Sequence, residues 1–228
     1  TLNYQATDEI SLSGGLDLRY YKGEHYSEIY DLLGADYAVS TDDANQLSAV
    51  KRVGDKIGYH NDGIVKWSGV FSQAEYSNGV ISAFFNVSGS NSAYKRIDYF
   101  KEKKEDKYSS TDWKWIRGYT VKTGANVNLD EFNNVFFNTG YISKAPRFDN
   151  IYTRSNTLQE YIHNEKVKAV EGGYSYRSSL FSANLNTYYT IWENKPANIS
   201  ETIGGTRYSD VVPMNALHKG IEMDLSFK

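Results

Sequence analysis

The sequence of 228 residues contains no cysteine and only 3 prolines, and its net charge at pH 7 is only −3. Without cysteine, disulfide bonds play no part in the fold. The scarcity of proline beside 18 glycines suits a protein of many strands and tight turns. The balanced charge gives no basis for nucleic-acid binding. No run approaches the ~20 apolar residues that a membrane-spanning helix needs.

Aromatic residues are abundant, with 20 Tyr, 10 Phe and 4 Trp. So much tyrosine suits surfaces that are half apolar and half wet, such as a membrane boundary or a binding groove. The mean hydropathy of −0.59 is typical of a water-soluble chain. A membrane β-barrel has the same average, because it keeps one polar face and long polar loops.

The clearest local pattern lies in residues 118–141. Apolar residues alternate with polar ones up to Asn128, and the alternation restarts after a short polar segment at 129–133. A period of two indicates extended strands, and the short join predicts an antiparallel hairpin.

The same unit repeats along the chain and predicts about eight strands. They begin near residues 9, 63, 81, 113, 134, 165, 181 and 217. Short turns are predicted at 77–79, 129–133 and 177–179, and long polar loops at 22–62, 101–112, 143–164 and 193–213. Tyr30, Leu32, Leu33 and Tyr37 suggest that part of the first loop folds back and packs.

Long loops on one side and short turns on the other are typical of outer-membrane barrels. The predicted fold is therefore all-β, an antiparallel up-and-down transmembrane β-barrel segment. With an even number of crossings, both chain ends are expected on the short-turn, periplasmic side.

Several segments resemble the barrel strands of TonB-dependent outer-membrane transporters, especially those of Bacteroidetes type. The segments are SKAPRFDNIY (143–152), GLDLRYYKGEHY (15–26), KIGYHNDGIVKW (56–67), TDWKWIRGY (111–119), NEKVKAVEGGYSYRS (164–178) and NALHKGIEMDL (215–225). The resemblance implies a 22-stranded barrel in the bacterial outer membrane that imports a scarce nutrient. It also implies a plug domain inside the barrel, TonB acting through that plug, a small-molecule or oligomeric ligand, and a surface lipoprotein as a further partner.

No segment resembles the plug, so residues 1–228 are expected to be a partial barrel domain. Its outer strands would pair with chain outside this sequence, since open edges cannot face lipid. The sequence starts at Thr1 without a leader, which fits a processed or excised chain. Two other interpretations stay open. One is a complete eight-stranded structural or adhesive barrel, and the other is a soluble all-β carbohydrate-binding module.

No catalytic pattern is present, and we expect no enzyme activity, cofactor or metal. His25, His60, His163 and His218 are far apart and lack metal-ligand spacing. An Asp/His pair in the outer loops is conceivable as a hydrolase site, but solvated histidines explain the pattern better.

The candidate ligand-facing residues lie on polar strand faces or near the long loops: Arg19, Tyr21, Trp67, Lys114, Arg147, Tyr188 and Trp192. Trp67 and Trp192 are predicted to face inward, where they pack or stack on a ligand, and Trp115 is predicted to face outward in an interfacial belt. Arg147, beside Pro146, is expected to order the rim, with a substrate contact as the minority interpretation. The polar faces predict a wet lumen, contacts to a plug, or a polar substrate path.

Overall fold

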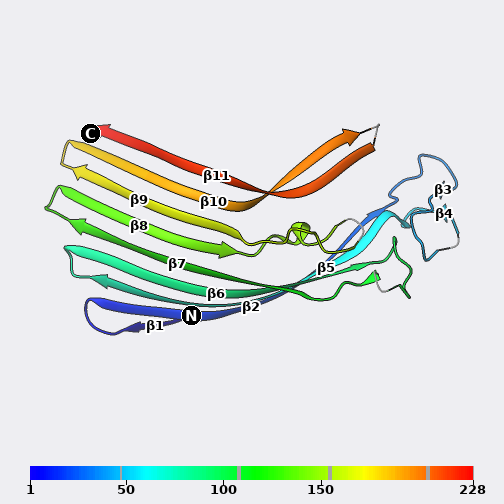
Figure 1. Ribbon diagram of the computed structural model, residues 1–228, viewed down its shortest axis with the longest axis horizontal. Coiled ribbons are helices and arrows are strands. Elements are labelled where there is room, and N and C mark those ends of the chain that lie inside the picture. The colour runs from blue at the N-terminus through cyan, green and yellow to red at the C-terminus, as the bar shows by residue number, and fades with distance from the viewer. Residues whose placement is uncertain (47, 107–108, 154–155, 204–205, 228) are drawn as a thin grey trace.

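The structure is a computed structural model that describes residues 1–228 apart from 47, 107–108, 154–155, 204–205 and 228. It is dominated by one nine-stranded sheet with the order β1-β2-β5-β6-β7-β8-β9-β10-β11 (Figure 1). The strands are β1 (Leu2–Gln5), β2 (Ile10–Glu28), β5 (Lys56–Ser77), β6 (Ile81–Asp98), β7 (Lys114–Asn128), β8 (Asn133–Lys144), β9 (Glu165–Arg177), β10 (Phe181–Ile203) and β11 (Thr206–Phe227). All neighbours pair antiparallel, so the predicted all-β class and up-and-down topology are confirmed.

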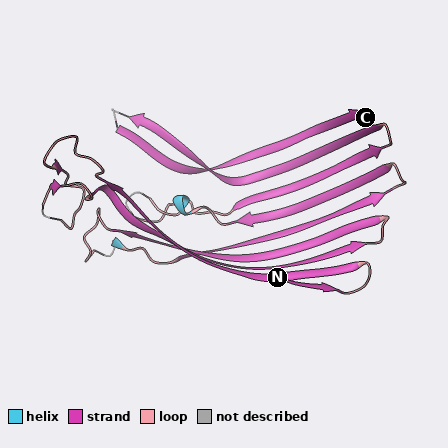
Figure 2. Ribbon diagram, turned by 180° about the vertical axis from the view of Figure 1, so that it is seen from behind, coloured by secondary structure: helices cyan, strands magenta, loops and turns pink. Residues whose placement is uncertain are grey.

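The sheet is a single curved layer that does not close on itself, because β1 and β11 end the strand order without pairing to each other. Short turns gather at one end of the sheet and long connections at the other (Figures 1 and 2). This is the wall of a barrel rather than a whole barrel, as predicted. No helix among the described residues is long and apolar enough to cross a lipid bilayer.

The sequence-based strand count was one too low. The additional strand, β1, is only 4 residues long and pairs with the lower part of β2, with Leu2 opposite Gly14. The C-terminus lies at the short-turn end as predicted, but the N-terminus lies part-way along β2 (Figure 1). The prediction failed because a segment this short offers too few alternating positions to show a period of two.

One predicted loop is almost entirely strand, and a second is strand at both of its ends. The segment 193–213, predicted as a loop, continues β10 to Ile203 and starts β11 at Thr206, so this hairpin extends beyond its neighbours. A bulge between Trp192 and Lys195 accompanies the bend of both strands in Figure 1. β2 and β5 likewise extend to Glu28 and from Lys56, within the predicted loop 22–62. These extensions are rich in polar residues and lack the apolar–polar alternation that predicts a strand. Where water surrounds both faces of a strand, neither face has to be apolar.

The remainder of this connection folds back as the two-stranded sheet β3 (Ala38–Val39) and β4 (Val50–Lys51). The residues predicted to pack were partly wrong, since Tyr30 and Leu33 are 92% and 93% exposed. Ile29, at 7% exposed, is buried instead.

The predicted short turns are confirmed. Two of them are stabilised by hydrogen bonds between a side chain and the backbone of the same turn. In the first turn, the Asn78 side-chain oxygen accepts hydrogen bonds from the N–H groups of Val80 and Ile81 at 3.1 and 2.8 Å. Gly79 follows with φ of 86°, a left-handed value that favours glycine. Asp130 accepts from Phe132 and Asn133 in the same way in the second turn.

The two faces of the sheet differ as the alternation predicts. We call the face that carries Leu16, Tyr119 and Ile221 the apolar face, and the face that carries Arg19 and Glu222 the polar face. Leu16 and Ile221 are 78% and 75% exposed, and no layer of the described chain covers them. These side chains are therefore available to hydrocarbon.

An aromatic chain crosses the short-turn end of the sheet from β8 to β11. Ring centroids are 6.4 Å apart for Phe132 and Tyr176, 6.1 Å for Tyr176 and Phe181, and 4.9 Å for Phe181 and Phe227. Aromatic rings in a row at one level mark a membrane–water interface.

Candidate functional site

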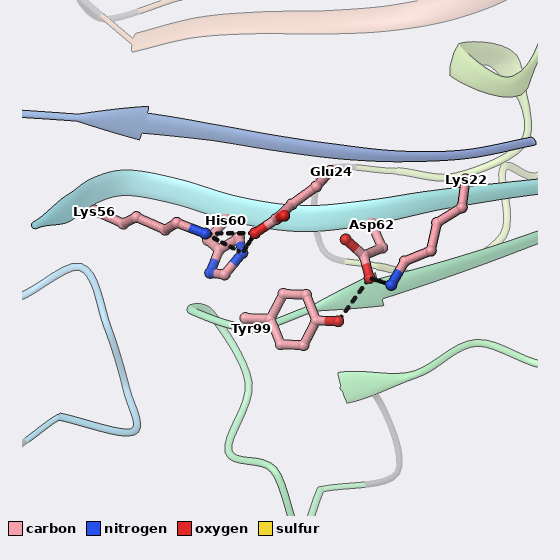
Figure 3. Close-up of polar contacts among 6 residues, drawn as sticks. All are labelled: Lys22, Glu24, Lys56, His60, Asp62 and Tyr99. Atoms are coloured by element: carbon pink, nitrogen blue, oxygen red, sulfur yellow. Dashed lines mark hydrogen bonds and ion pairs between the residues drawn. The ribbon is translucent and has the colours of Figure 1, made fainter. Parts of the chain in front are cut away.

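The long-loop end is organised by the β2–β5 hairpin, which extends beyond the neighbouring strands. The carboxylate of Asp62 on β5 is buried, at 1% exposed, and Asp62 pairs in register with Glu24 on β2. The Lys22 ammonium lies 2.8 Å from the Asp62 carboxylate, and the Tyr99 hydroxyl donates a hydrogen bond to it at 2.6 Å (Figure 3). These partners offset the cost of burying the carboxylate.

The same contacts change the proton affinity of the partners. The hydrogen bond to Asp62 raises the pKa of Lys22, because it favours the charged ammonium. It also raises the pKa of the Tyr99 phenol, because ionisation would remove the proton that Asp62 accepts. Lys22 therefore stays charged and the Tyr99 hydroxyl stays neutral near neutral pH.

A second polar group stands beside the first. Glu24 contacts Lys56 and lies 2.7 Å from His60 Nε2, and the hydrogen bond from Lys56 followed by that from His60 lowers the pKa of Glu24 (Figure 3). The His60 ring packs on the rings of Tyr99 and Phe100, with centroids 4.5 and 5.6 Å away. We call Lys22, Glu24, Lys56, His60, Asp62 and Tyr99 the bracket, because they fasten residues 99–100 to the hairpin.

Asn45, beside the bracket, connects the loop after β2 to the loop after β6. The Asn45 amide donates hydrogen bonds to the carbonyls of Tyr99 and Glu102 at 3.0 and 2.9 Å, and its oxygen accepts from the N–H of Lys104 at 2.9 Å. Among the described residues, no cluster of three or more His, Asp or Glu side chains is arranged to hold a metal. The contacts of the bracket and of Asn45 hold residues 99–104 against the hairpin.

The opposite face of the hairpin carries a different loop. Residues 145–163, of which 154–155 are not described, cross the polar face and are here called the strap. Tyr94 lies on this face, since it pairs in register with Lys114. Its hydroxyl donates to the Pro146 carbonyl at 2.8 Å, and the Tyr152 hydroxyl donates to the Tyr94 carbonyl at 2.7 Å.

The strap holds the main hydrophobic cluster of the described chain. Tyr94, Ile151 and Tyr152 are 6%, 0% and 5% exposed, and Val65, Ile116, Phe148 and Ile162 pack against them. Phe148, in the short 3-10 helix η2 (Phe148–Asn150), lies over Gly63, where an added Cβ would be 3.2 Å from the ring. Glycine at this position lets the strap approach the β5 backbone closely.

The predicted ligand-facing residues form separate groups. Arg19 and Trp67 pair in register, and the guanidinium lies 5.1 Å from the Trp67 ring centre. Arg19 also pairs with Asp17 on its own strand. Tyr21 and Lys114 lie on the same polar face, nearer the long loops.

The other candidates lie across the sheet. Tyr188 and Trp192 lie on the polar face of β10 with Thr190 between them. The Lys195 ammonium is 4.7 Å from the Trp192 ring centre. Between Trp67 on β5 and Trp192 on β10 there are five strand spacings, or roughly 24 Å along the sheet. The registers place Trp67 and Trp192 on the polar face and Trp115 on the apolar face, as the alternation predicts. Arg147 is exposed, and its carbonyl accepts from the N–H of Asn150 at 2.9 Å, so its backbone orders the start of η2.

Sequence reasoning missed the strap cluster and the buried Asp62. The available signal was a group of large apolar residues inside an otherwise polar loop, at Phe148, Ile151 and Tyr152. Asp62 had no signal of its own, because its partners come from strands and loops that only the fold brings together.

No protein-family model and no curated protein matches the sequence. Solved structures do match: the copper transporter OprC, with a TM-score of 0.74 and 11% identity, covers 99% of this chain. Two variants of the FrpB iron transporter from Neisseria meningitidis give TM-scores of 0.62 and 0.61 at 12% and 14% identity, again over 99% of the chain. The chain spans about a third of the length of these structures, 32–33%.

The fold is therefore that of a section of the barrel wall of these transporter structures. The likeness confirms the predicted fold, an antiparallel up-and-down β-barrel wall that stays open in this chain.

Proposed function

We propose that this chain supplies wall and extracellular loops to a TonB-dependent receptor that imports a scarce nutrient across the outer membrane. The observation that carries the proposal is the open antiparallel sheet, whose apolar face is exposed and whose long loops gather at one end. Residues 1–228 then form a partial barrel domain. The remaining strands, the plug and TonB act with it, and a surface lipoprotein is a further candidate partner.

In this function the outer loops capture the ligand and the polar face lines its path. The bracket and the strap hold loops on opposite sides of one hairpin, so they fix the shape of the entrance. TonB, driven by the inner-membrane proton gradient, would then act on the plug. This section would contribute binding and shape, with no catalytic step of its own.

Within the wall we propose two ligand-facing positions. Arg19 with Trp67 offers a cation beside an aromatic plane, and Tyr188 with Trp192 offers two aromatic rings on one strand. Such surfaces suit the rings of a chelate or a sugar and the anionic edge of a ligand. The matched transporters carry copper and iron by name, and siderophores, corrinoids, glycans and peptides are all candidates for this chain.

Uptake tests the function directly. A strain that lacks the gene for the full-length protein is compared with the complemented strain for accumulation of labelled ferric siderophore, corrinoid, oligosaccharide and peptide. We expect one ligand class to require the gene and to stop accumulating when the proton gradient is collapsed. Uptake of every class that is equal in both strains would refute the proposal.

The wall itself can be tested by thiol labelling, because this chain has no cysteine. We expect Leu185→Cys, on the apolar face of β10, to resist a membrane-impermeant maleimide in intact outer membranes. The matched control Asn184→Cys faces the other way. A soluble carbohydrate-binding module would label at both positions without detergent.

A further inference from the structure

The apolar face carries a groove near its long-loop end, across β2, β5, β6 and β7. Two adjoining concavities of about 420 and about 350 Å3 share Leu18 and Ser68. Leu16 and Leu18 border the groove on β2, and Trp115, 55% exposed, borders it on β7. Its floor is low because small residues, Ser68 and Gly89, occupy the strands between.

Two cations stand at this groove. The Lys66 ammonium lies 4.4 Å from the ring centre of Trp113, and Arg117 is an exposed lining residue. The two side chains come from strands on either side of β6, and Arg117 lies two residues along β7 from Trp115, which is level with Lys66. Two strand spacings and two residues along a strand place their Cα atoms roughly 12 Å apart.

Both cations lie at one height in the membrane. Lys66 is about 11 residues from the short-turn end of β5, and Arg117 is about 11 residues from that of β7. A tilted strand crosses the hydrocarbon in about 9–11 residues. The two cations therefore reach the outer headgroup level while the leucines below them remain at the level of acyl chains.

The signs of charge differ between the faces. On β5 from Lys66 to the short turn, and on the described side chains of β7 and β9–β11, the charged residues of the apolar face are cations except Glu193: Lys66, Arg117, Lys166, Lys168 and Lys219. Asp62 lies on the same face of β5 four residues beyond Lys66, where Lys22 pairs with it. Glu193 pairs with Lys168 at 2.8 Å. Five acidic side chains of the same sheet lie on the polar face: Asp17, Glu75, Glu171, Glu222 and Asp224. Glu24, like Asp62, lies on the other face beyond the groove, where Lys56 pairs with it. An anion in the outer leaflet would meet mainly cations.

We propose that this groove binds a phosphate-bearing lipid of the outer leaflet. An acyl chain lies along Leu16 and Leu18, and a phosphate group lies between Lys66 and Arg117. The indole of Trp113 beside Lys66 supplies the amphipathic surface that suits headgroup depth. The proposal goes beyond nutrient import and does not depend on which nutrient is carried.

The test is lipid retention by the full-length receptor purified in detergent, followed by native mass spectrometry. The protein is titrated with bis-phosphorylated lipid A, with its dephosphorylated form, and with phosphatidylglycerol. Each cation near an anionic headgroup is worth about 1 kcal/mol, so Lys66→Ala/Arg117→Ala should weaken lipid A binding about 30-fold. Lys122→Ala, a cation on the polar face of β7, is the matched control and should leave binding unchanged.

A second variant tests the groove without changing charge. An added Cβ at Gly89 would have only Val70 near it, at 4.0 Å, so Gly89→Leu fits the backbone and fills the floor. We expect it to reduce lipid A binding while the heat-dependent gel migration of the barrel stays normal. Equal binding of phosphorylated and dephosphorylated lipid A by the wild type would overturn the proposal. So would unchanged binding in both variants, equal loss in Lys122→Ala, or phosphatidylglycerol binding as tightly as lipid A.

Discussion

Replacing Ile151 with alanine should release the strap from the polar face without unfolding the wall. Ile151 is fully buried, and its neighbours Tyr94 and Tyr152 are anchored by hydrogen bonds of 2.8 and 2.7 Å to and from the strap. Truncation of a buried isoleucine to alanine costs about 2–5 kcal/mol, from lost transfer free energy and the cavity left behind. At 1.4 kcal/mol per tenfold, the strap should open about 30-fold to about 4,000-fold more often.

Hydrogen exchange of the full-length receptor in detergent measures this opening. Amides of 147–153 that are described here should lose protection by that factor, while β7 and β8 keep theirs, because the sheet ladder does not depend on the strap. Leu158→Ala, in the same loop but 48% exposed, is the control and should change exchange less than about fivefold. Unchanged exchange in Ile151→Ala, or equal loss throughout β5–β8, would refute the role given to this cluster.

Three further predictions concern the bracket, the strap and the aromatic chain. Asp62→Asn should weaken the bracket by about 1–3 kcal/mol, because a charge-assisted contact is lost while the half-exposed Lys22 side chain can turn to water. Limited trypsin digestion should then cut faster at Lys103 or Lys104. An unchanged cleavage rate would contradict this prediction. Burial raises the pKa of Tyr94 and Tyr152 above the ordinary value of 10.0. Their neutral forms therefore stabilise the strap below that pH, and this stability is lost as the pH rises through the folded-state pKa. Hydrogen exchange of the strap amides should accelerate above about pH 10, and a flat pH profile would refute this prediction. Phe181→Ala should destabilise the barrel by about 1–3 kcal/mol in a denaturant titration, since its ring contacts Tyr176 and Phe227, whereas Leu180→Ala, 70% exposed in the adjoining turn, should not.

The membrane-level part of the fold could be predicted because lipid on one side and water on the other force a period of two. Residues such as Leu185 and Asn186 therefore report their faces directly, and Asn78-Gly79 marks a turn by local chemistry. The extended hairpins were mistaken for loops because water surrounds both of their faces. Their strand structure is held by pairing of the backbone, as at Ser200 and Ser209, which leaves no pattern in the sequence.

The candidate site was predictable only in part, for the same reason. Trp67 and Arg19 could be placed on one face by parity, yet their contact depends on the register of β2 against β5. Predicting the bracket would require more than a strand register, because Tyr99 contacts Asp62 from the segment that follows β6. A contact across 37 residues between a strand and a loop has no periodic signature in either segment.

The polar face has one regularity that connects its sequence to its shape. Five glycines on this face lie beside aromatic rings of neighbouring residues: Gly15 by Phe71, Gly69 by Trp67, Gly124 by Phe84, Gly173 by Phe136 and Gly220 by Tyr188. In each case a Cβ would occupy the space of the ring, so the ring lies flat along the wall only because the neighbour has no side chain. In a single-layer sheet these rings pack on no second layer. Each ring takes the space that a side chain at its glycine would fill, so the polar face stays low at these positions.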